Sequence, residues 1–229
     1  EERLQTYKKN YPSYYRILNM YLKNDFSEVD KYIETLENKF VSSRVASGEI
    51  LNIVSDNFSN LLGGCADVSS STKAQVYSAN FHENPVGRNI MFGVREFAMS
   101  GIANGIALYG GLTPFVSTFM SFADYLKGGI RMSALMGLRV LYILTHDSVM
   151  VGKDGPTHQP VEQLAMLRAQ PNTYVFRPCD YTETCAAYSC ALNLNAPSVL
   201  TLSRQDLEPV NSSFENAKKG AYIVLKEDK

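Results

Sequence analysis

Short apolar runs alternate with longer amphipathic stretches over most of the chain. Six runs of strand length are rich in Val, Ile, Phe, Tyr and Thr, as β-strands usually are: 63–68, 89–94, 113–119, 139–147, 173–179 and 198–204. Apolar residues recur at helical spacing in 42–62, 95–110, 122–137, 160–170 and 181–195. Since both kinds of element are largely apolar, the pattern predicts an α/β fold, with a mostly parallel sheet and helices on both faces.

Residues 1–40 have a different texture, because they are charged and rich in Tyr, Lys, Asp and Glu. We therefore expect a connector arm of short amphipathic helices over 1–40 and the α/β domain over 41–229. The longest uncharged run, Ala98–Ala123, contains Pro114 and several glycines, which predicts a buried helix, a turn and a buried strand in place of a membrane span. The start of the chain has neither a signal-peptide pattern nor an initiator Met, as expected for a piece of a longer protein.

Composition and charge exclude several classes of protein. The 229 residues are 45% hydrophobic and 20% charged with a net charge of −1, so no basic surface for nucleic acid and no membrane partner is expected. The four cysteines form no C-x-x-C pair and only three histidines are present, which argues against a zinc site. Each cysteine is expected to be a small buried hydrophobic residue in a reducing compartment.

Polar residues follow the predicted strands at the ends where parallel sheets bind ligands. They are Asp67, Arg95–Glu96, 145–148 ("THDS"), 177–180 and Ser203–Arg204. The loop after "THDS", with the sequence "VMVGKDGPTHQPVEQ", is dense in Gly, Pro and polar groups, and loops of this length are often functional. We expect all of these residues to converge on one edge of the sheet.

Each of these residues also has a structural interpretation. Glu96 could complement a helix dipole, His146 could be satisfied by a backbone carbonyl, and His158 could be a loop residue. The aromatic residues of 119–125 could belong to the core, and Gly63–Gly64 could form a tight turn. A G-x-S-x-G elbow and the common phosphate loops are absent from the sequence. The residue pattern alone therefore indicates an α/β domain with a polar site at the strand-end edge.

Several longer strings occur together and in a recognisable order. They are "LGGCADVSSS", "FGVREFAM", "IANGIALYGG", "STFMSFADY", "RMSALM", "THDSVMVGKDGPTHQPVEQLA", "RPCD" and "LSRQDL". On these strings the chain resembles, from Ser42 to about Pro209, the middle, pyrimidine-binding domain of transketolase, a thiamine diphosphate enzyme. Deoxyxylulose phosphate synthases and the β chains of 2-oxo acid dehydrogenases share that fold and the glutamate, but not the "THDS…GPTHQP" and "SRQ" strings.

The resemblance implies a cofactor site around Glu96. This residue would hydrogen-bond N1′ of the aminopyrimidine of thiamine diphosphate, which requires an apolar setting that lets the carboxyl keep a proton. Its apolar neighbours in the sequence suit that role: Phe92, Val94, Phe97 and Met99. An aromatic pocket for the pyrimidine is implied for Phe119, Phe122 and Tyr125, with Asp67 nearby. Arg95 is expected to be an ion-pair partner on the buried rim.

The resemblance also implies a sugar-phosphate site. Asp154 would contact a hydroxyl of the donor sugar, and His158 would line the same channel. The phosphate would be held by Arg44, Ser71, His146 and Arg204. Together with Glu96, the two histidines 146 and 158 are the expected catalytic residues. Lys153 and Cys65 stand where the family usually has Glu and Ser, and "VSSRVAS" replaces the more familiar "ATRKAS".

One expected motif is missing. The G-D-G…N string that binds Mg²⁺ and the diphosphate in this family does not occur, so a preceding domain would supply it, and a C-terminal domain would follow. The resemblance implies a cytoplasmic homodimer in which the partner subunit completes the site, so the isolated chain is expected to be inactive. The full enzyme would transfer a two-carbon ketol group from a ketose phosphate to an aldose phosphate in the pentose phosphate pathway. A dihydroxyacetone synthase, or a non-catalytic α/β assembly module, remains open.

Overall fold

The centre of the molecule is a parallel sheet of six strands in the order β2-β1-β3-β4-β6-β5. The computed structural model describes residues 1–226. Its strands are β1 (Leu61–Cys65), β2 (Asn89–Met91), β3 (Thr113–Phe119), β4 (Leu141–Thr145), β5 (Tyr174–Phe176) and β6 (Ser198–Leu202). The predicted fold class and all six predicted strands are confirmed. Most strands end before the apolar run does, because the last residues of each run turn into the loops that carry the polar side chains.

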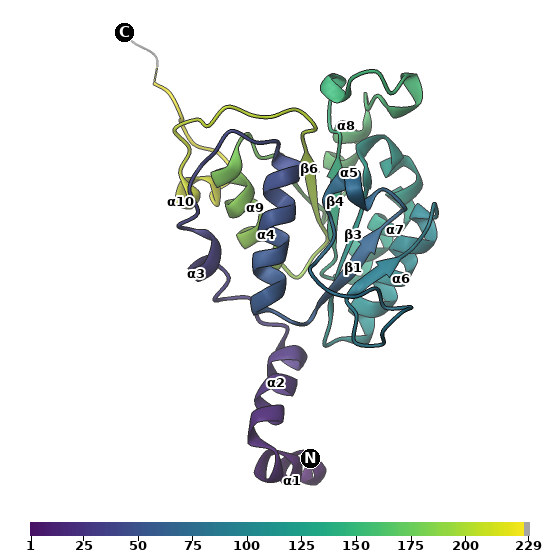
Figure 1. Cartoon of the computed structure of the whole chain (residues 1–229), viewed down its shortest axis with the longest axis vertical. Coiled ribbons are helices and arrows are strands. Elements are labelled where there is room, and N and C mark those ends of the chain that lie inside the picture. The colour runs from purple at the N-terminus through teal and green to yellow at the C-terminus, as the bar shows by residue number, and fades with distance from the viewer. Residues whose placement is uncertain (227–229) are drawn as a thin grey trace.

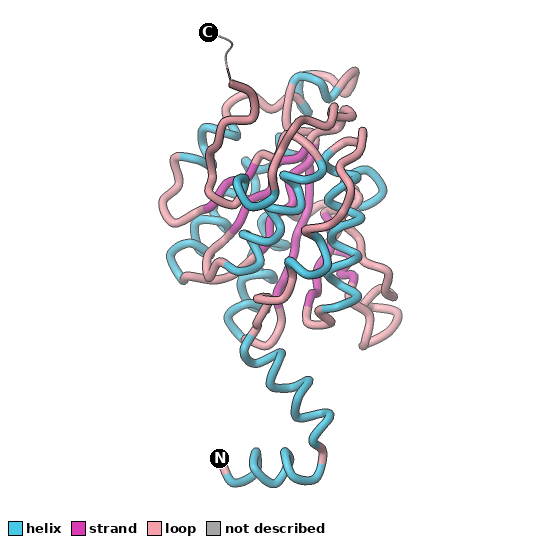
Figure 2. The backbone as a smooth tube through the Cα atoms, turned by 90° about the vertical axis from the view of Figure 1, so that its left-hand side faces the viewer, coloured by secondary structure: helices cyan, strands magenta, loops and turns pink. Residues whose placement is uncertain are grey.

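Helices cover both faces of the sheet, as Figure 1 and Figure 2 show. One face carries α3 (Asp30–Ile33), α4 (Ser43–Asn57), α9 (Tyr181–Asn193) and α10 (Phe214–Ala217). The other face carries α6 (Glu96–Tyr109), α7 (Ala123–Met136) and α8 (Gln163–Arg168). The short helix α5 (Ser69–Thr72) follows β1, and 3-10 turns η1, η2 and η3 occupy Met120–Phe122, Val149–Val151 and Pro156–His158.

The central strands are apolar on both faces because each face is covered by helices. Along β4, Leu141 and Ile143 join the core beneath α4 and α9, whereas Tyr142 and Leu144 join the core beneath α6 and α7. Every residue of β3, β4 and β6 is buried. This double coverage explains why these strands read as continuous apolar runs instead of alternating ones.

Residues 1–40 divide into two parts. Helices α1 (Glu2–Asn10) and α2 (Pro12–Lys23) contain no buried residue and project away from the domain (Figure 1, Figure 2). By contrast, Phe26, Val29 and Ile33 are at most 1% exposed and pack into the core beside α4. The free part of the predicted connector therefore ends before Phe26. Within residues 1–226, no helix combines the length and apolar character needed to cross a membrane.

Gly63 and Gly64 lie inside strand β1, so the tight-turn interpretation is wrong. A Cβ on Gly63 would lie 1.8 Å from the carbonyl oxygen of Phe115 in β3, and one on Gly64 would lie 1.9 Å from that of Ile90 in β2. Contacts this short are impossible between nonbonded heavy atoms. These two glycines are therefore required by the close approach of the neighbouring strands.

Two other predictions need correction. The uncharged run does form a helix and a buried strand, but α6 is buried on one side only, with Ile102, Leu108 and Tyr109 at 50%, 66% and 93% exposure. Not every cysteine is a buried hydrophobic residue either, because Cys179 is exposed at the loop after β5. In both cases the composition of the segment does not tell which of its side chains are covered by the rest of the domain.

Candidate active site

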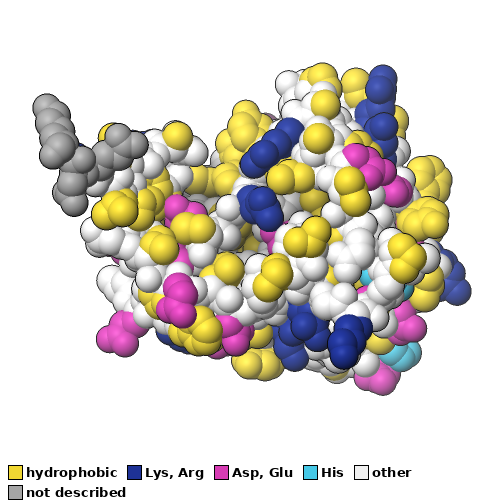
Figure 3. Space-filling view, turned by 90° about the horizontal axis from the view of Figure 1, so that it is seen from above, with side chains coloured by type: hydrophobic (Ala, Val, Ile, Leu, Met, Phe, Trp, Pro, Cys, Tyr) yellow, Lys and Arg dark blue, Asp and Glu magenta, His cyan; other side chains and the backbone are white. Residues whose placement is uncertain are grey.

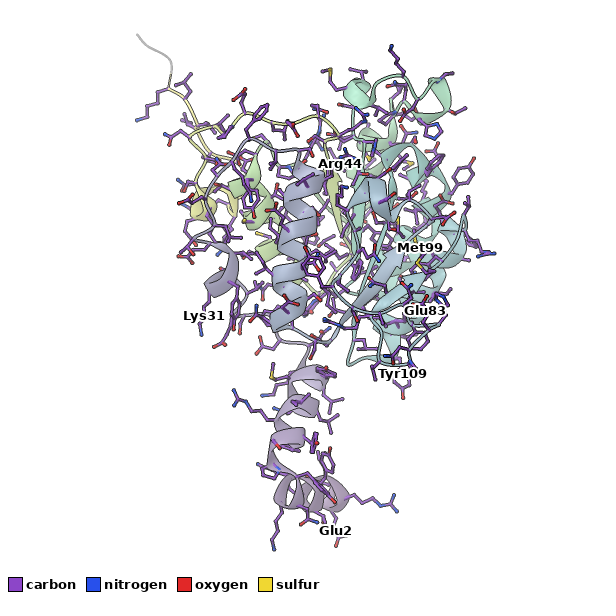
Figure 4. The ribbon with its side chains drawn as sticks, viewed as in Figure 1. Glu2, Lys31, Arg44, Glu83, Met99 and Tyr109 are labelled. Carbon is purple, nitrogen blue, oxygen red and sulfur yellow. The ribbon has the colours of Figure 1, made fainter. Side chains whose placement is uncertain are left out.

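The polar strand ends meet along one edge of the domain, the upper edge in Figure 1. Arg44, at the start of α4, is labelled at this edge in Figure 4. Figure 3 looks down on the same edge, where basic side chains lie among apolar ones. The loops after β1, β3, β4 and β6 all leave the sheet here, because parallel strands carry their carboxyl ends to the same side.

Glu96 is the first residue of α6 and is only 8% exposed. Its Oε1 atom accepts a hydrogen bond of 3.3 Å from Oγ1 of Thr118, which is fully buried near the end of β3. Both side chains line an open cavity of about 720 Å³. The rest of the wall is mainly apolar and aromatic: Ala66, Val68, Val94, Arg95, Phe97, Ala98, Phe122 and Tyr125.

The apolar setting expected for Glu96 is present on one side only. Phe92 and Met99 are buried, at 5% and 0% exposure, whereas Val94 and Phe97 are 76% and 68% exposed and form the outer wall of the cavity. Arg95 is exposed, and its Nη1 donates to the Phe92 carbonyl at 2.7 Å. The ion pair expected for Arg95 is not formed within residues 1–226, where the side chain instead holds the turn before α6.

The aromatic residues form a chain of contacts across the site. Phe122 and Tyr125, with ring centroids 6.2 Å apart, line the cavity beside Glu96. Phe119 stacks on Phe122 at 6.2 Å and lies only 3.9 Å from the ring of His146. The interpretation of these residues as core fits Phe119, which is 9% exposed, but not Tyr125, which is 62% exposed. His158 lies edge-on to Phe122 at 5.3 Å.

His146 follows β4 with a left-handed backbone, φ +61°, and is 3% exposed. Its Nδ1 atom lies 2.8 Å from the Thr145 hydroxyl, so that hydroxyl is its partner in place of the backbone carbonyl considered above. Burial, and then the positive charges of Arg44 and Arg204, lower the pKa of His146 to about 4, which Asp154 only partly opposes. The imidazole is therefore neutral at pH 7.

This pKa predicts a pH dependence of stability. In the unfolded chain His146 takes up a proton below about pH 6.5, but in the folded chain it stays neutral down to about pH 4. The unfolded state therefore binds more protons in this range, and the free energy of unfolding should fall by about 2 to 3 kcal/mol as the pH drops from 6.5 to 4. Urea unfolding at a series of pH values measures it. His146→Gln should remove this part of the slope, with His82→Gln as the matched surface control; an unchanged slope in His146→Gln contradicts the assignment.

The residues expected to hold a phosphate lie around His146. Arg44 donates from Nη1 to the Ser71 carbonyl at 2.6 Å, and its Nε is buried without a partner among the described residues. Burial and the charge of Arg204 lower the pKa of Arg44. Arg204 extends towards Gly152 in the loop after β4: its Nη1 atom lies 3.8 Å from the point where a side chain at Gly152 would place its Cβ.

Two acidic residues of the expected site are exposed. Asp154 lies in the loop after β4, close enough to His146 for its charge to oppose the lowering of that pKa. Asp67 follows β1 with φ +63° and is not part of the cavity wall, although its neighbours Ala66 and Val68 are. The structure thus brings Asp154 into the group around His146 and leaves Asp67 at the margin of the cavity.

The sequence did not reveal one ion pair at this edge. Nε of Arg177, after β5, donates to Oδ2 of Asp147, after β4, at 2.8 Å, and the Asp147 side chain is 6% exposed. Since β6 lies between these strands, the pair ties their ends together across it. Two other strand-end residues are structural: Asp180 accepts from Glu183 N as the cap of α9, and Ser203 accepts from Ser43 N.

A mainly apolar and aromatic cavity at the carboxyl edge of a parallel sheet, with one buried carboxyl group in its wall, has the features of a small-molecule binding site. Consistent with this, residues 39–209 match the family model described as "Transketolase, pyrimidine binding domain". The chain belongs to the transketolase family, and the resemblance seen in its sequence is confirmed.

Similar proteins agree with this assignment. The chain is 49% identical over 193 residues to the transketolase of Geobacillus stearothermophilus, an alignment that covers 81% of this chain and 29% of the relative. Its fold matches Leishmania mexicana transketolase with a TM-score of 0.93 and 38% identity, over 99% of this chain and 35% of that one. It also matches Pichia stipitis transketolase in complex with sedoheptulose-7-phosphate, with a TM-score of 0.91 and 36% identity. That match covers 100% of this chain and 36% of the Pichia chain. The chain therefore spans about a third of the length of these relatives.

Proposed function

We propose that this chain is the part of a transketolase that binds the aminopyrimidine of thiamine diphosphate. The complete protein would be a transferase that moves a two-carbon ketol group from a ketose phosphate to an aldose phosphate, in the pentose phosphate pathway of the cytoplasm. The observation that supports this most directly is the buried Glu96, which faces an open aromatic cavity with one carboxylate oxygen already hydrogen-bonded to Thr118.

The residues around the cavity fit the cofactor. A carboxyl that is 8% exposed, set beside the rings of Phe122 and Tyr125, offers a polar contact to a ring nitrogen and aromatic faces for stacking. In the proposed complex Glu96 holds a proton at N1′, and Phe122 and Tyr125 orient the ring and exclude water. When bound, thiamine diphosphate supplies the carbon nucleophile of the reaction. We assign Mg²⁺ and the diphosphate to another domain of the complete protein.

The group around His146 is proposed as the sugar-phosphate site. Arg44 and Arg204 provide two guanidinium groups, which suit a phosphate because they donate in pairs and stay charged. Both guanidinium groups lower the pKa of His146, which supports the view that they lie close to this imidazole and to each other. Asp154 and His158 would contact hydroxyls of the sugar, and Ser71 would complete the phosphate contacts. Pichia stipitis transketolase has been solved with sedoheptulose-7-phosphate bound, in agreement with a phosphorylated sugar as substrate.

A second subunit is proposed to cover the cavity. Large apolar side chains are exposed on the outer faces of α6 and α7 and at the mouth of the cavity. A monomeric domain rarely exposes so large a contiguous apolar surface. They are Phe97, Ile102, Leu108, Tyr109, Tyr125, Met132 and Leu135. Figure 4 shows Tyr109 at the end of α6 away from the edge that carries Arg44. A homodimer would bury this surface and close the open side of the site.

One experiment tests the assignment and the shared site together. The protein expressed from its native reading frame should bind thiamine diphosphate with Mg²⁺ in calorimetry and transfer ketol groups between phosphorylated sugars. The isolated chain should do neither, because half of the site is missing. Micromolar binding by the isolated chain would contradict the shared site. Transfer to formaldehyde in place of aldose phosphates would indicate a dihydroxyacetone synthase, and absence of both binding and transfer would indicate a non-catalytic module.

A further inference from the structure

We infer that Thr118 is a positioning residue that selects which oxygen of Glu96 faces the bound ring. The inference rests on the proposed function, since it concerns how this chain presents Glu96 to the cofactor. It starts from the hydrogen bond that Thr118 Oγ1 donates to Glu96 Oε1 at 3.3 Å, within the wall of the cavity.

The hydroxyl of Thr118 has a fixed position. Thr118 lies in the central strand β3, is fully buried, and pairs in register with Leu144 of β4. It shares a face of the strand with Val116, which packs into the core beneath α6 and α7. Valine has nearly the same shape as threonine, so packing alone would be served equally well by an apolar side chain. A buried hydroxyl costs free energy unless it is hydrogen-bonded, and its acceptor here is Glu96.

This contact makes the two oxygens of Glu96 unequal. A hydroxyl has a single proton to donate, and Thr118 gives it to Oε1, so Oε1 acts as an acceptor. When the carboxyl is protonated, its carbonyl oxygen is a better acceptor for this hydroxyl than its hydroxyl oxygen is, so the hydrogen bond favours the proton on Oε2. Oε2 is then the oxygen that is placed to donate to a ring nitrogen. A half-turn of the protonated carboxyl would bring its hydroxyl oxygen, the weaker acceptor, to Thr118 in place of the carbonyl oxygen.

The test uses the complete protein and the variants Thr118→Val and Thr118→Ser. Thiamine diphosphate affinity is measured by calorimetry with Mg²⁺, and the imino tautomer of the bound aminopyrimidine is followed by near-ultraviolet circular dichroism at saturating cofactor. Thr118→Val should weaken cofactor affinity about tenfold and reduce the tautomer signal by at least half, because Oε1 is left buried without a donor. Thr118→Ser keeps the hydroxyl and should stay within about threefold of the unchanged protein.

A matched control separates positioning from loss of stability. Thr201 in β6 is also buried, at 1% exposure, and donates to the Phe176 carbonyl away from the cavity. Thr201→Val removes a comparable hydrogen bond and should leave both the cofactor affinity and the tautomer signal unchanged.

The outcomes distinguish the inference from the proposed function. If Thr118→Val binds cofactor and shows the tautomer signal like the unchanged protein, or if Thr118→Ser fails as badly as Thr118→Val, the inference is wrong while the proposed function stands. If the unchanged protein binds no thiamine diphosphate and shows no tautomer signal, the proposed function itself is wrong and the inference fails with it.

Discussion

Exchange of Glu96 for glutamine should lower the kcat of the complete protein by roughly a hundredfold to ten thousandfold, the usual contribution of a positioned proton-transfer group. Glutamine keeps the size of the side chain and can keep an oxygen acceptor for Thr118, but its amide cannot take up and release a proton at the ring nitrogen. The measurement is the rate of ketol transfer from a phosphorylated ketose. Thermal unfolding should change little, because the replacement leaves the packing around α6 intact.

Glu83→Gln is the matched control for this variant. Glu83 is exposed, and its contacts are with Asn80 and His82, outside the cavity. This variant also replaces a carboxylate with an amide, but it leaves the site unchanged. Its kcat should equal that of the unchanged protein. A Glu96→Gln protein that kept more than a tenth of the original kcat would rule out the proposed proton role.

Gly63→Ala should be among the most destabilising single changes in the chain. The added Cβ would lie 1.8 Å from the Phe115 carbonyl oxygen. This Cβ is bonded directly to the backbone of β1 and the oxygen belongs to the backbone of β3, so the clash cannot be relieved without breaking the β1–β3 ladder. We expect the free energy of unfolding to fall by more than about 4 kcal/mol, or the protein not to fold. Urea unfolding of the isolated chain, together with its soluble yield, measures this.

Gly101→Ala is the corresponding control. Gly101 lies in α6, and a Cβ there would have no heavy atom within 4 Å apart from the helix itself. The replacement should stabilise the protein by about 0.5 to 1 kcal/mol, because alanine is the better helix former. Equal stabilities of the Gly63→Ala and Gly101→Ala proteins would mean that the strands adjust far more easily than their packing suggests.

The sequence was most informative where a pattern follows directly from repeated geometry. Strands such as 113–119 and 198–202 are buried on both faces, so their apolar runs were visible without knowledge of their neighbours. The order of polar strand ends also placed His146 and Glu96 at one edge, because parallel strands all point the same way. The strands needed only the apolar pattern, and the site edge needed only the common direction of the parallel strands.

Contacts between distant segments were harder to predict. Nothing in the sequence near Thr118 marks it as a partner of Glu96, since their hydrogen bond depends on how α6 starts relative to the end of β3. The pair of Asp147 and Arg177 depends on the order β4-β6-β5, which chain order does not give. The sequence pattern placed Thr118 within a buried strand, one residue before its end, and gave no sign of what its hydroxyl contacts.

The exposed side of α6 was missed for a different reason. An apolar helix is normally buried by its own domain, and the run from Ala98 gave no indication that Ile102 and Leu108 would face outward. Gly63 and Gly64 were also ambiguous, because glycine pairs are more common in turns than in strands. For α6, composition was correct about the helix and uninformative about what covers it; for the glycine pair, composition did not decide between a strand and a turn.

The ring of Phe119 touches three other members of the site: Phe122, His146 and His158. A larger or smaller side chain at any of these four positions would create an overlap or a gap that the other three must absorb. As sequences of this family diverge, we therefore expect these positions to change together or not at all. The imidazole beside the arginines and the aromatic wall beside Glu96 would then have a common evolutionary history, imposed by one phenyl ring.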